Sequence, residues 1–148
     1  GASSAARLEL PYMSERLGAA KLNMFSMMAT WCGACRAELP ELGGLRKQFG
    51  AADLAMYGFP ADVKEDAGLL ASYDKEVDPV YELLTDVPKD QVAAIVAYMK
   101  STLGTDALPQ TVVTDTHGRV LLTRYGAPTV SELKRLPATD VEALGGSR

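Results

Sequence analysis

The sequence predicts a single α/β domain in which a central mixed sheet carries helices on both faces. The chain has 148 residues, about the length of one domain, and 47% of them are hydrophobic, which is enough for a core. Short strand-like runs alternate with longer helix-like segments, an order typical of parallel sheets. Two strands joined by a tight turn near the end of the chain add an antiparallel edge.

The first half of the chain begins with a buried strand. Lys21 to Met28 is a nearly continuous apolar run, as expected for a strand buried on both faces. Apolar residues then recur every three or four positions from Cys32 to Phe49, which predicts a helix. Pro40 should kink this helix because it lacks an N–H. Leu54 to Phe59 is the second expected strand, and Pro60 ends it.

The middle of the chain predicts two helices separated by a strand. Lys64 to Tyr73 is expected to be helical, with Asp62 as its N-cap. Val80 to Leu84 has the composition of a short strand. Lys89 to Leu103 is the longest expected helix: a proline precedes it, a glycine follows it, and an apolar stripe runs along it.

The last elements are a hairpin and a helix. Gln110 to Thr114 and Val120 to Tyr125 are predicted strands, joined by the turn Asp115 to Gly118. Thr129 to Leu136 is the final predicted helix. We expect residues 1–20 to be an N-terminal leader or extension and residues 21–148 to form the domain.

Composition excludes several function classes. The 15 basic and 19 acidic residues are interspersed and give a net charge of −4, so nucleic acid is not an expected partner. No apolar stretch approaches the 18 residues of a membrane span.

We expect this protein to be a monomer. The only two cysteines and the single histidine are too few for a structural zinc site, which takes four protein ligands.

The two cysteines carry the predicted chemistry. Cys32 and Cys35 stand in one Cys-x-x-Cys, where the first strand gives way to the first helix. Unpaired N–H groups at a helix start favour a thiolate, so Cys32 is the expected nucleophile and is expected to be exposed. Cys35, one turn further on, should be more buried and can close a disulfide onto Cys32.

Two segments resemble one known family. Phe25-Ser-Met-Met-Ala-Thr-Trp-Cys-Gly-Ala-Cys-Arg-Ala-Glu-Leu-Pro-Glu41 resembles the active-site segment of thioredoxin-fold proteins of the TlpA/ResA-like branch, which are bacterial extracytoplasmic thiol–disulfide oxidoreductases. Leu108-Pro-Gln-Thr-Val-Val-Thr-Asp-Thr-His-Gly-Arg-Val120 resembles the segment of that branch in which a cis proline faces the cysteines. The likeness covers about Lys21 to Leu136.

The resemblance implies a thioredoxin-like fold with an extra strand–helix insertion, here Val80 to Leu103. It implies a periplasmic or otherwise extracytoplasmic reductant that exchanges disulfides with partner proteins, needs no cofactor and is reset by a membrane electron donor. An anchor outside this chain could hold it at the membrane. The implied catalytic residues are Cys32, Cys35, Pro109 and Glu38, and the implied partner-binding residues are Trp31, Gly33, Ala34 and Leu108.

The sequence departs from the family pattern at three positions. The dipeptide between the cysteines is Gly-Ala, without the proline of thioredoxin. Ser26 replaces a buried acid or amide, so the proton of Cys35 must pass to water or to another acid such as Glu38, three residues further along the helix. Leu108 precedes Pro109, at a position that often tunes the potential and partner choice.

The alternative function is a copper-binding module of the Sco type, which is also thioredoxin-like. Cu(I) suits a cysteine pair with a methionine or histidine. That family, however, separates its cysteines by three residues, and here His117 lies in the expected hairpin turn. A third interpretation, a redox-silent interaction domain, requires Cys32 to be unreactive towards alkylating agents.

Overall fold

The computed structural model describes residues 11–18 and 20–137 of the chain. A five-stranded sheet with the strand order β3-β2-β1-β4-β5 forms its centre. Strands β2 and β3 run parallel to β1, while β4 is antiparallel to both β1 and β5, so the sheet is mixed as predicted. The elements are α1 (Pro11–Ser14), β1 (Leu22–Met28), α2 (Gly33–Ala37), α3 (Leu39–Gln48), β2 (Leu54–Pro60), α4 (Ala67–Val77), β3 (Glu82–Leu83), α5 (Lys89–Leu103), β4 (Gln110–Thr114), β5 (Val120–Tyr125) and α6 (Val130–Lys134).

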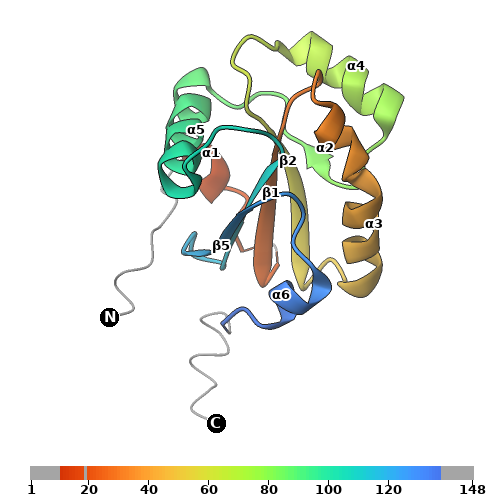
Figure 1. Ribbon diagram of the computed structural model, residues 1–148, viewed down its shortest axis with the longest axis vertical. Coiled ribbons are helices and arrows are strands. Elements are labelled where there is room, and N and C mark those ends of the chain that lie inside the picture. Colours follow the sequence, from red (N-terminus) through yellow and green to blue (C-terminus); the bar gives the residue numbers. More distant parts are fainter. Residues whose placement is uncertain (1–10, 19, 138–148) are drawn as a thin grey trace.

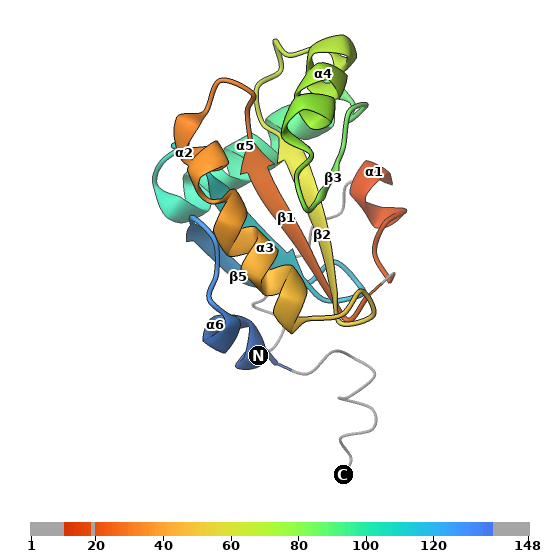
Figure 2. The same ribbon diagram turned by 90° about the vertical axis from the view of Figure 1, so that its right-hand side faces the viewer.

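Helices cover both faces of the sheet. Figure 1 shows α1 and α5 on one side of the strands and α2, α3 and α4 on the other, and Figure 2 shows α6 on the same side as α3. Successive side chains of a strand point to opposite faces, so β1 supplies both cores. Met24 and Met28 belong to the cluster that contains the cysteines, and Phe25 and Met27 belong to the cluster on the α5 side.

Most predicted elements are confirmed, and three differ. The helix expected from Cys32 to Phe49 is two helices, α2 and α3. The strand at Val80 to Leu84 shortens to two residues at the sheet edge. Helix α4 starts at Ala67, and its N-cap is Asp66, whose carboxylate accepts the N–H of Leu69, rather than Asp62.

The first residues that the structure describes form a short helix, α1. Met13 of α1 is buried in the α5-side cluster, against which Tyr12 also packs. Residues 1–10 of the predicted leader, and residues 138–148, lie outside the described residues. The predicted boundary at residue 20 therefore stays a prediction. None of the helices within 11–18 and 20–137 combines the length and apolar character that crossing a bilayer requires.

A glycine on β2 allows close packing beside the cysteine-side core. A Cβ at Gly58 would overlap the ring of Tyr81, which is buried. Overpacked cores cost about 1–3 kcal/mol. We therefore expect Gly58→Ala to lower the free energy of unfolding by about 1–3 kcal/mol, measured by urea denaturation. Gly43→Ala in α3 is the control, because its Cβ would meet nothing within 4 Å and alanine favours a helix by about 0.5–1 kcal/mol. An unchanged stability for Gly58→Ala would contradict this account.

Candidate active site

The two cysteines lie at the carboxyl end of the central strand, as the motif predicts. Cys32 is the N-cap of α2, and Cys35 lies within that helix. They form a disulfide, and their Cα atoms are 5.2 Å apart. The backbone N–H of Cys35 donates to Cys32 Sγ at 3.0 Å. A helix-start N–H therefore points at the sulfur of Cys32, the contact expected to favour its thiolate after reduction.

The exposure predicted for Cys32 is wrong for this oxidised state. Cys32 is 5% exposed and Cys35 is 2% exposed, and both belong to the cysteine-side core. The two sulfurs are bonded to each other, and Met28 and Ala29 belong to the same buried cluster as the cysteines. The order of burial agrees with the prediction, but the difference is small. Accessibility alone does not distinguish the two sulfurs.

Glu38 joins the two helices that follow the motif. Its N–H donates to the carbonyl of Ala34 at 3.2 Å, and its own carbonyl accepts the N–H groups of Glu41 and Leu42 at 2.9 and 3.1 Å. The break in the helix thus falls at Glu38. Pro40 instead takes the second position of α3, where a helix has no acceptor for an N–H.

The Glu38 carboxyl is a buried acid. The residue is 6% exposed, and Oε1 has no hydrogen-bond partner among the described residues. Burial, reinforced by the negative charge of Glu41, raises the pKa of Glu38 to about 7, against the opposing effect of Arg124. Such a carboxyl can exchange a proton near neutral pH, as an acid–base group requires.

Ser26 occupies the position of the missing family acid and is fully buried. It lies on β1 between Met24 and Met28, so its side chain points to the cysteine-side face of the sheet. Its Oγ has no hydrogen-bond partner within the described part of the chain. The neutral hydroxyl leaves Glu38 as the buried carboxyl of this site.

The bond before Pro109 is cis, which confirms that prediction. Three hydrogen bonds join this loop and the adjacent strand β4 to the end of β5. The hydroxyl of Tyr125 donates to the carbonyl of Leu108 at 3.1 Å, and the N–H of Gly126 donates to the carbonyl of Pro109 at 2.9 Å. The hydroxyl of Thr111 donates to the carbonyl of Gly126 at 2.8 Å. The ends of both hairpin strands, β4 and β5, therefore fix the position of the Pro109 loop.

The structure brings the predicted site residues together around the motif. A small open cleft of about 210 Å³ is lined by Ala34, Glu38 and Pro109, together with Tyr125. Trp31 and Leu108 line a second cavity. Gly33 is exposed at the first position of α2. His117, the further copper ligand considered for the Sco alternative, lies in the turn after β4, at the opposite end of that strand from Pro109.

Two carboxylates hold the loop that precedes Cys32. Both oxygens of Glu65 accept the backbone N–H of Thr30 at 3.1 Å, and the hydroxyl of Thr30 also donates to Glu65. The indole N–H of Trp31 donates to Asp62 at 2.7 Å, although the indole is 66% exposed. The segment after β2 thus positions the residues immediately before Cys32.

Comparison with known proteins decides the family. A model of the AhpC/TSA family matches residues 10–123. The chain belongs to the AhpC/TSA family. A thiol:disulfide interchange protein DsbE homolog of Paracoccus denitrificans is 33% identical to it over 112 residues, which are 75% of this chain and 54% of the relative. The chain therefore spans about half the length of that relative.

Solved structures show that this AhpC/TSA family member has the thioredoxin-like fold. A thiol:disulfide interchange protein of the thioredoxin family from Chlorobium tepidum TLS matches with a TM-score of 0.57 and 23% identity, covering 78% of this chain and 76% of the other. A thiol-disulfide isomerase from Corynebacterium glutamicum matches with a TM-score of 0.60 and 13% identity, covering 93% and 84%. The family resemblance and fold predicted from the sequence are thus confirmed.

Sequence reasoning missed several residues of this AhpC/TSA site. Tyr125 could have been found, because the hairpin pairs it with Gln110 and so places it beside Pro109. Asp62 and Glu65 carried no such signal. Their roles depend on how the segment after β2 meets the Thr30–Trp31 loop in space.

Proposed function

We propose that this chain is a thiol–disulfide oxidoreductase that exchanges its Cys32–Cys35 dithiol with disulfides of partner proteins. The disulfide at the start of α2, with a backbone N–H directed at Cys32 Sγ, is the observation that carries the proposal. The Cys32 thiolate attacks one sulfur of a partner disulfide, forms a mixed disulfide and releases a partner thiolate. Cys35 then attacks Cys32 Sγ and releases the second partner thiolate, so two electrons pass to the partner.

Glu38 is the proposed proton acceptor for Cys35. Cys35 must lose its proton before it can attack, and the carboxyl that follows it by three residues titrates near neutral pH. Pro109 and Leu108 are proposed to contact the bound partner opposite the cysteines. Trp31, Gly33 and Ala34 are exposed around the motif and complete the proposed partner-binding surface.

We further propose that the protein acts as a reductant outside the cytoplasm and takes its electrons from a membrane donor. The resemblance of the active-site segment and of the Pro109 segment to the TlpA/ResA-like branch supports this proposal. Alkylation of free thiols in separated cell fractions tests the compartment: the protein should be recovered outside the cytoplasm with its pair mainly reduced.

Equilibration of the purified protein with glutathione tests the proposed function. The Cys32–Cys35 pair should cycle reversibly between dithiol and disulfide, and the dithiol should reduce insulin and hydroxyethyl disulfide. A pair that neither equilibrates with glutathione nor reduces these substrates would contradict the proposal.

Replacing the second residue of the dipeptide should shift the potential. Ala34 is at the second position of α2, where the backbone N–H has no intrahelical acceptor, so proline fits there. Without this proline, we expect the Cys32–Cys35 pair to have a less reducing potential than thioredoxin, whose potential is about −270 mV. Ala34→Pro should make it more reducing in the same glutathione titration, and an unchanged potential would show that the dipeptide does not control it.

A further inference from the structure

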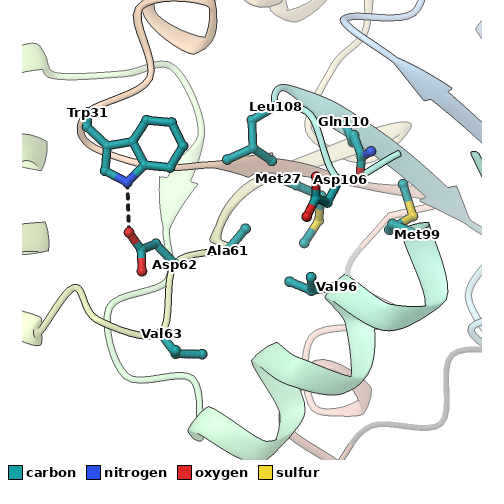
Figure 3. Close-up of a pocket in the computed structure, with 10 residues that line it drawn as sticks. All are labelled: Met27, Trp31, Ala61, Asp62, Val63, Val96, Met99, Asp106, Leu108 and Gln110. Carbon is teal, nitrogen blue, oxygen red and sulfur yellow. Dashed lines mark hydrogen bonds between the residues drawn. The ribbon is translucent and has the colours of Figure 1, made fainter. Parts of the chain in front are cut away.

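A cavity of about 300 Å³ is lined by Trp31 and Leu108, the residues that precede Cys32 and Pro109 in the chain. It lies where four parts of the chain meet: the Trp31 loop, the segment 61–63 after β2, helix α5, and the loop that leads to Pro109 (Figure 3). Trp31 immediately precedes Cys32, and Leu108 immediately precedes Pro109. A polypeptide bound at Cys32 therefore passes next to the cavity and can place a side chain in it.

Most of the cavity lining is apolar. Met27 and Met99 are buried and face the cavity together with Val96 of α5. Trp31 and Val63, which also line the cavity, are two large hydrophobic residues that the structure leaves exposed. Exposed apolar residues gathered at a concave site mark a binding surface.

The charge of the lining has one sign. Of the ten lining residues two are acidic, Asp62 and Asp106, and none is basic. Figure 3 shows Asp62 hydrogen-bonded to Trp31 on one side and Asp106 beside Leu108 on the other. Asp106 is exposed. Among residues 11–18 and 20–137, its side chain forms no ion pair and no hydrogen bond.

Asp62 is held in its charged form. The backbone N–H of Lys64 and the indole N–H of Trp31 donate to its carboxylate, and these hydrogen bonds, with the positive charge of Lys64, lower the pKa of Asp62. The Lys64 side chain is not part of the lining. The cavity thus combines an apolar surface with two carboxylates.

We propose that this cavity accepts a lysine or arginine side chain of the partner protein that exchanges its disulfide with Cys32. The inference rests on the proposed function and specifies the partner. The aliphatic stem of a basic residue packs against Met27, Val96 and Met99, while its charged head approaches Asp106 and Asp62. The exposed indole of Trp31 adds a face for a cation.

The size and charge of the cavity favour this occupant over others. Pockets for whole small molecules range from about 300 to 1,000 Å³, so this cavity is at the lower limit and suits a side chain. The chain has a net charge of −4, which attracts a basic partner at long range.

Disulfide-linked peptides test the proposal. Each peptide carries one cysteine in a mixed disulfide with 2-mercaptoethanol, and the residues on either side of the cysteine are replaced in turn by lysine, norleucine or glutamate. Exchange with the reduced protein is followed by stopped-flow fluorescence. At the best position we expect lysine to react about two- to fivefold faster than norleucine, the range of a solvent-exposed ion pair, and glutamate to react more slowly. Salt should reduce the difference.

Charge-matched variants assign the preference to the cavity. Asp106→Asn should lower the lysine-to-norleucine rate ratio towards one. Asp90→Asn removes the same charge from the exposed first turn of α5, outside the lining, and should keep the ratio. Trp31 is the sole tryptophan of the chain, so its fluorescence gives a second readout. Cysteine-free lysine peptides should change it in the oxidised protein, and Asp106→Asn should weaken that change.

The outcomes separate this inference from the proposed function. If hydroxyethyl disulfide and every peptide fail to react with the reduced wild-type protein, the proposed function fails, and the partner assignment fails with it. If they react but lysine shows no advantage at any position, only the basic occupant is wrong. A norleucine preference would identify a purely apolar subsite. A preference that survives Asp106→Asn would place the basic residue elsewhere.

Discussion

Cys35→Ser should accumulate mixed disulfides with partner proteins, whereas Cys32→Ser should accumulate none. In Cys35→Ser, the backbone N–H of residue 35 can still donate to Cys32 Sγ, so attack on a partner disulfide proceeds. The covalent complex then persists because no second thiol releases the partner. In Cys32→Ser the remaining thiol lies inside α2, away from the N-cap position. Both variants should lose catalytic turnover completely.

Two measurements check this division of roles. Mass spectrometry after exposure to a disulfide substrate counts trapped partners, and alkylation rates between pH 5 and pH 9 compare the two thiols. Cys32 should react faster at and below neutral pH. The double variant Cys32→Ser/Cys35→Ser is the control for non-covalent binding. If Cys32→Ser traps as many partners as Cys35→Ser, or Cys35 alkylates faster below pH 7, the nucleophile assignment is reversed.

The sequence predicts best the elements whose limits are set locally. Helix α5 begins after Pro88 and ends at Gly104, which adopts a left-handed conformation with φ 78°, so the bounds Lys89–Leu103 agree with the prediction. The hairpin strands are equally well bounded, because the turn between them ends in Gly118 with φ 82°. These signals lie within a few residues of the limits that they set.

Predictions fail where a distant contact decides. The sequence predicts Asp62 as the cap of α4, but the Asp62 carboxylate accepts the indole N–H of Trp31 and the backbone N–H of Lys64, and Asp66 caps the helix. The second difference is the break between α2 and α3 at Glu38. The apolar residues keep their helical spacing across this break, so the spacing alone does not reveal that α2 and α3 are separate helices. Pro40 correctly predicted an interruption of the helix, but the break lies two residues earlier, at Glu38.

The same distinction applies to the active site. The cysteine pair and Pro109 lie in motifs of consecutive residues, so the sequence identified them. The cavity that includes Asp106 combines residues from four separate parts of the chain. No local pattern reports such a juxtaposition, and only the structure reveals the acidic lining beside Trp31.

Glu38→Gln should remove a pH dependence of stability between about pH 4.5 and pH 7. In the unfolded chain the carboxyl ionises near 4.5, but in the folded protein burial raises its pKa to about 7. Between these values the folded state holds a proton that the unfolded state releases, so stability falls as pH rises through this range. The difference of about 2.5 pH units, at about 1.4 kcal/mol each, corresponds to a loss of up to about 3.5 kcal/mol.

Urea denaturation of the oxidised protein at several pH values measures this effect. Glu38→Gln should show a flatter profile than wild type and should be the more stable protein above pH 7, because it buries no charge. Glu76→Gln is the control, since Glu76 is an exposed residue that pairs with Arg36 at 3.9 Å, and it should keep the wild-type slope. Glu41→Gln should reduce the slope without removing it, because Glu41 contributes to the raised pKa.

The kinetic consequence distinguishes a proton acceptor from a buried acid that only titrates. If the Glu38 carboxylate accepts the proton of Cys35, release of the mixed disulfide should accelerate as pH rises through about 7, where that carboxylate forms. Glu38→Gln should lose this inflection and release the partner more slowly, while the first attack by Cys32 keeps its rate. An inflection that persists in Glu38→Gln, alongside the flattened stability profile, would show that Glu38 titrates in the fold but takes no part in proton transfer from Cys35.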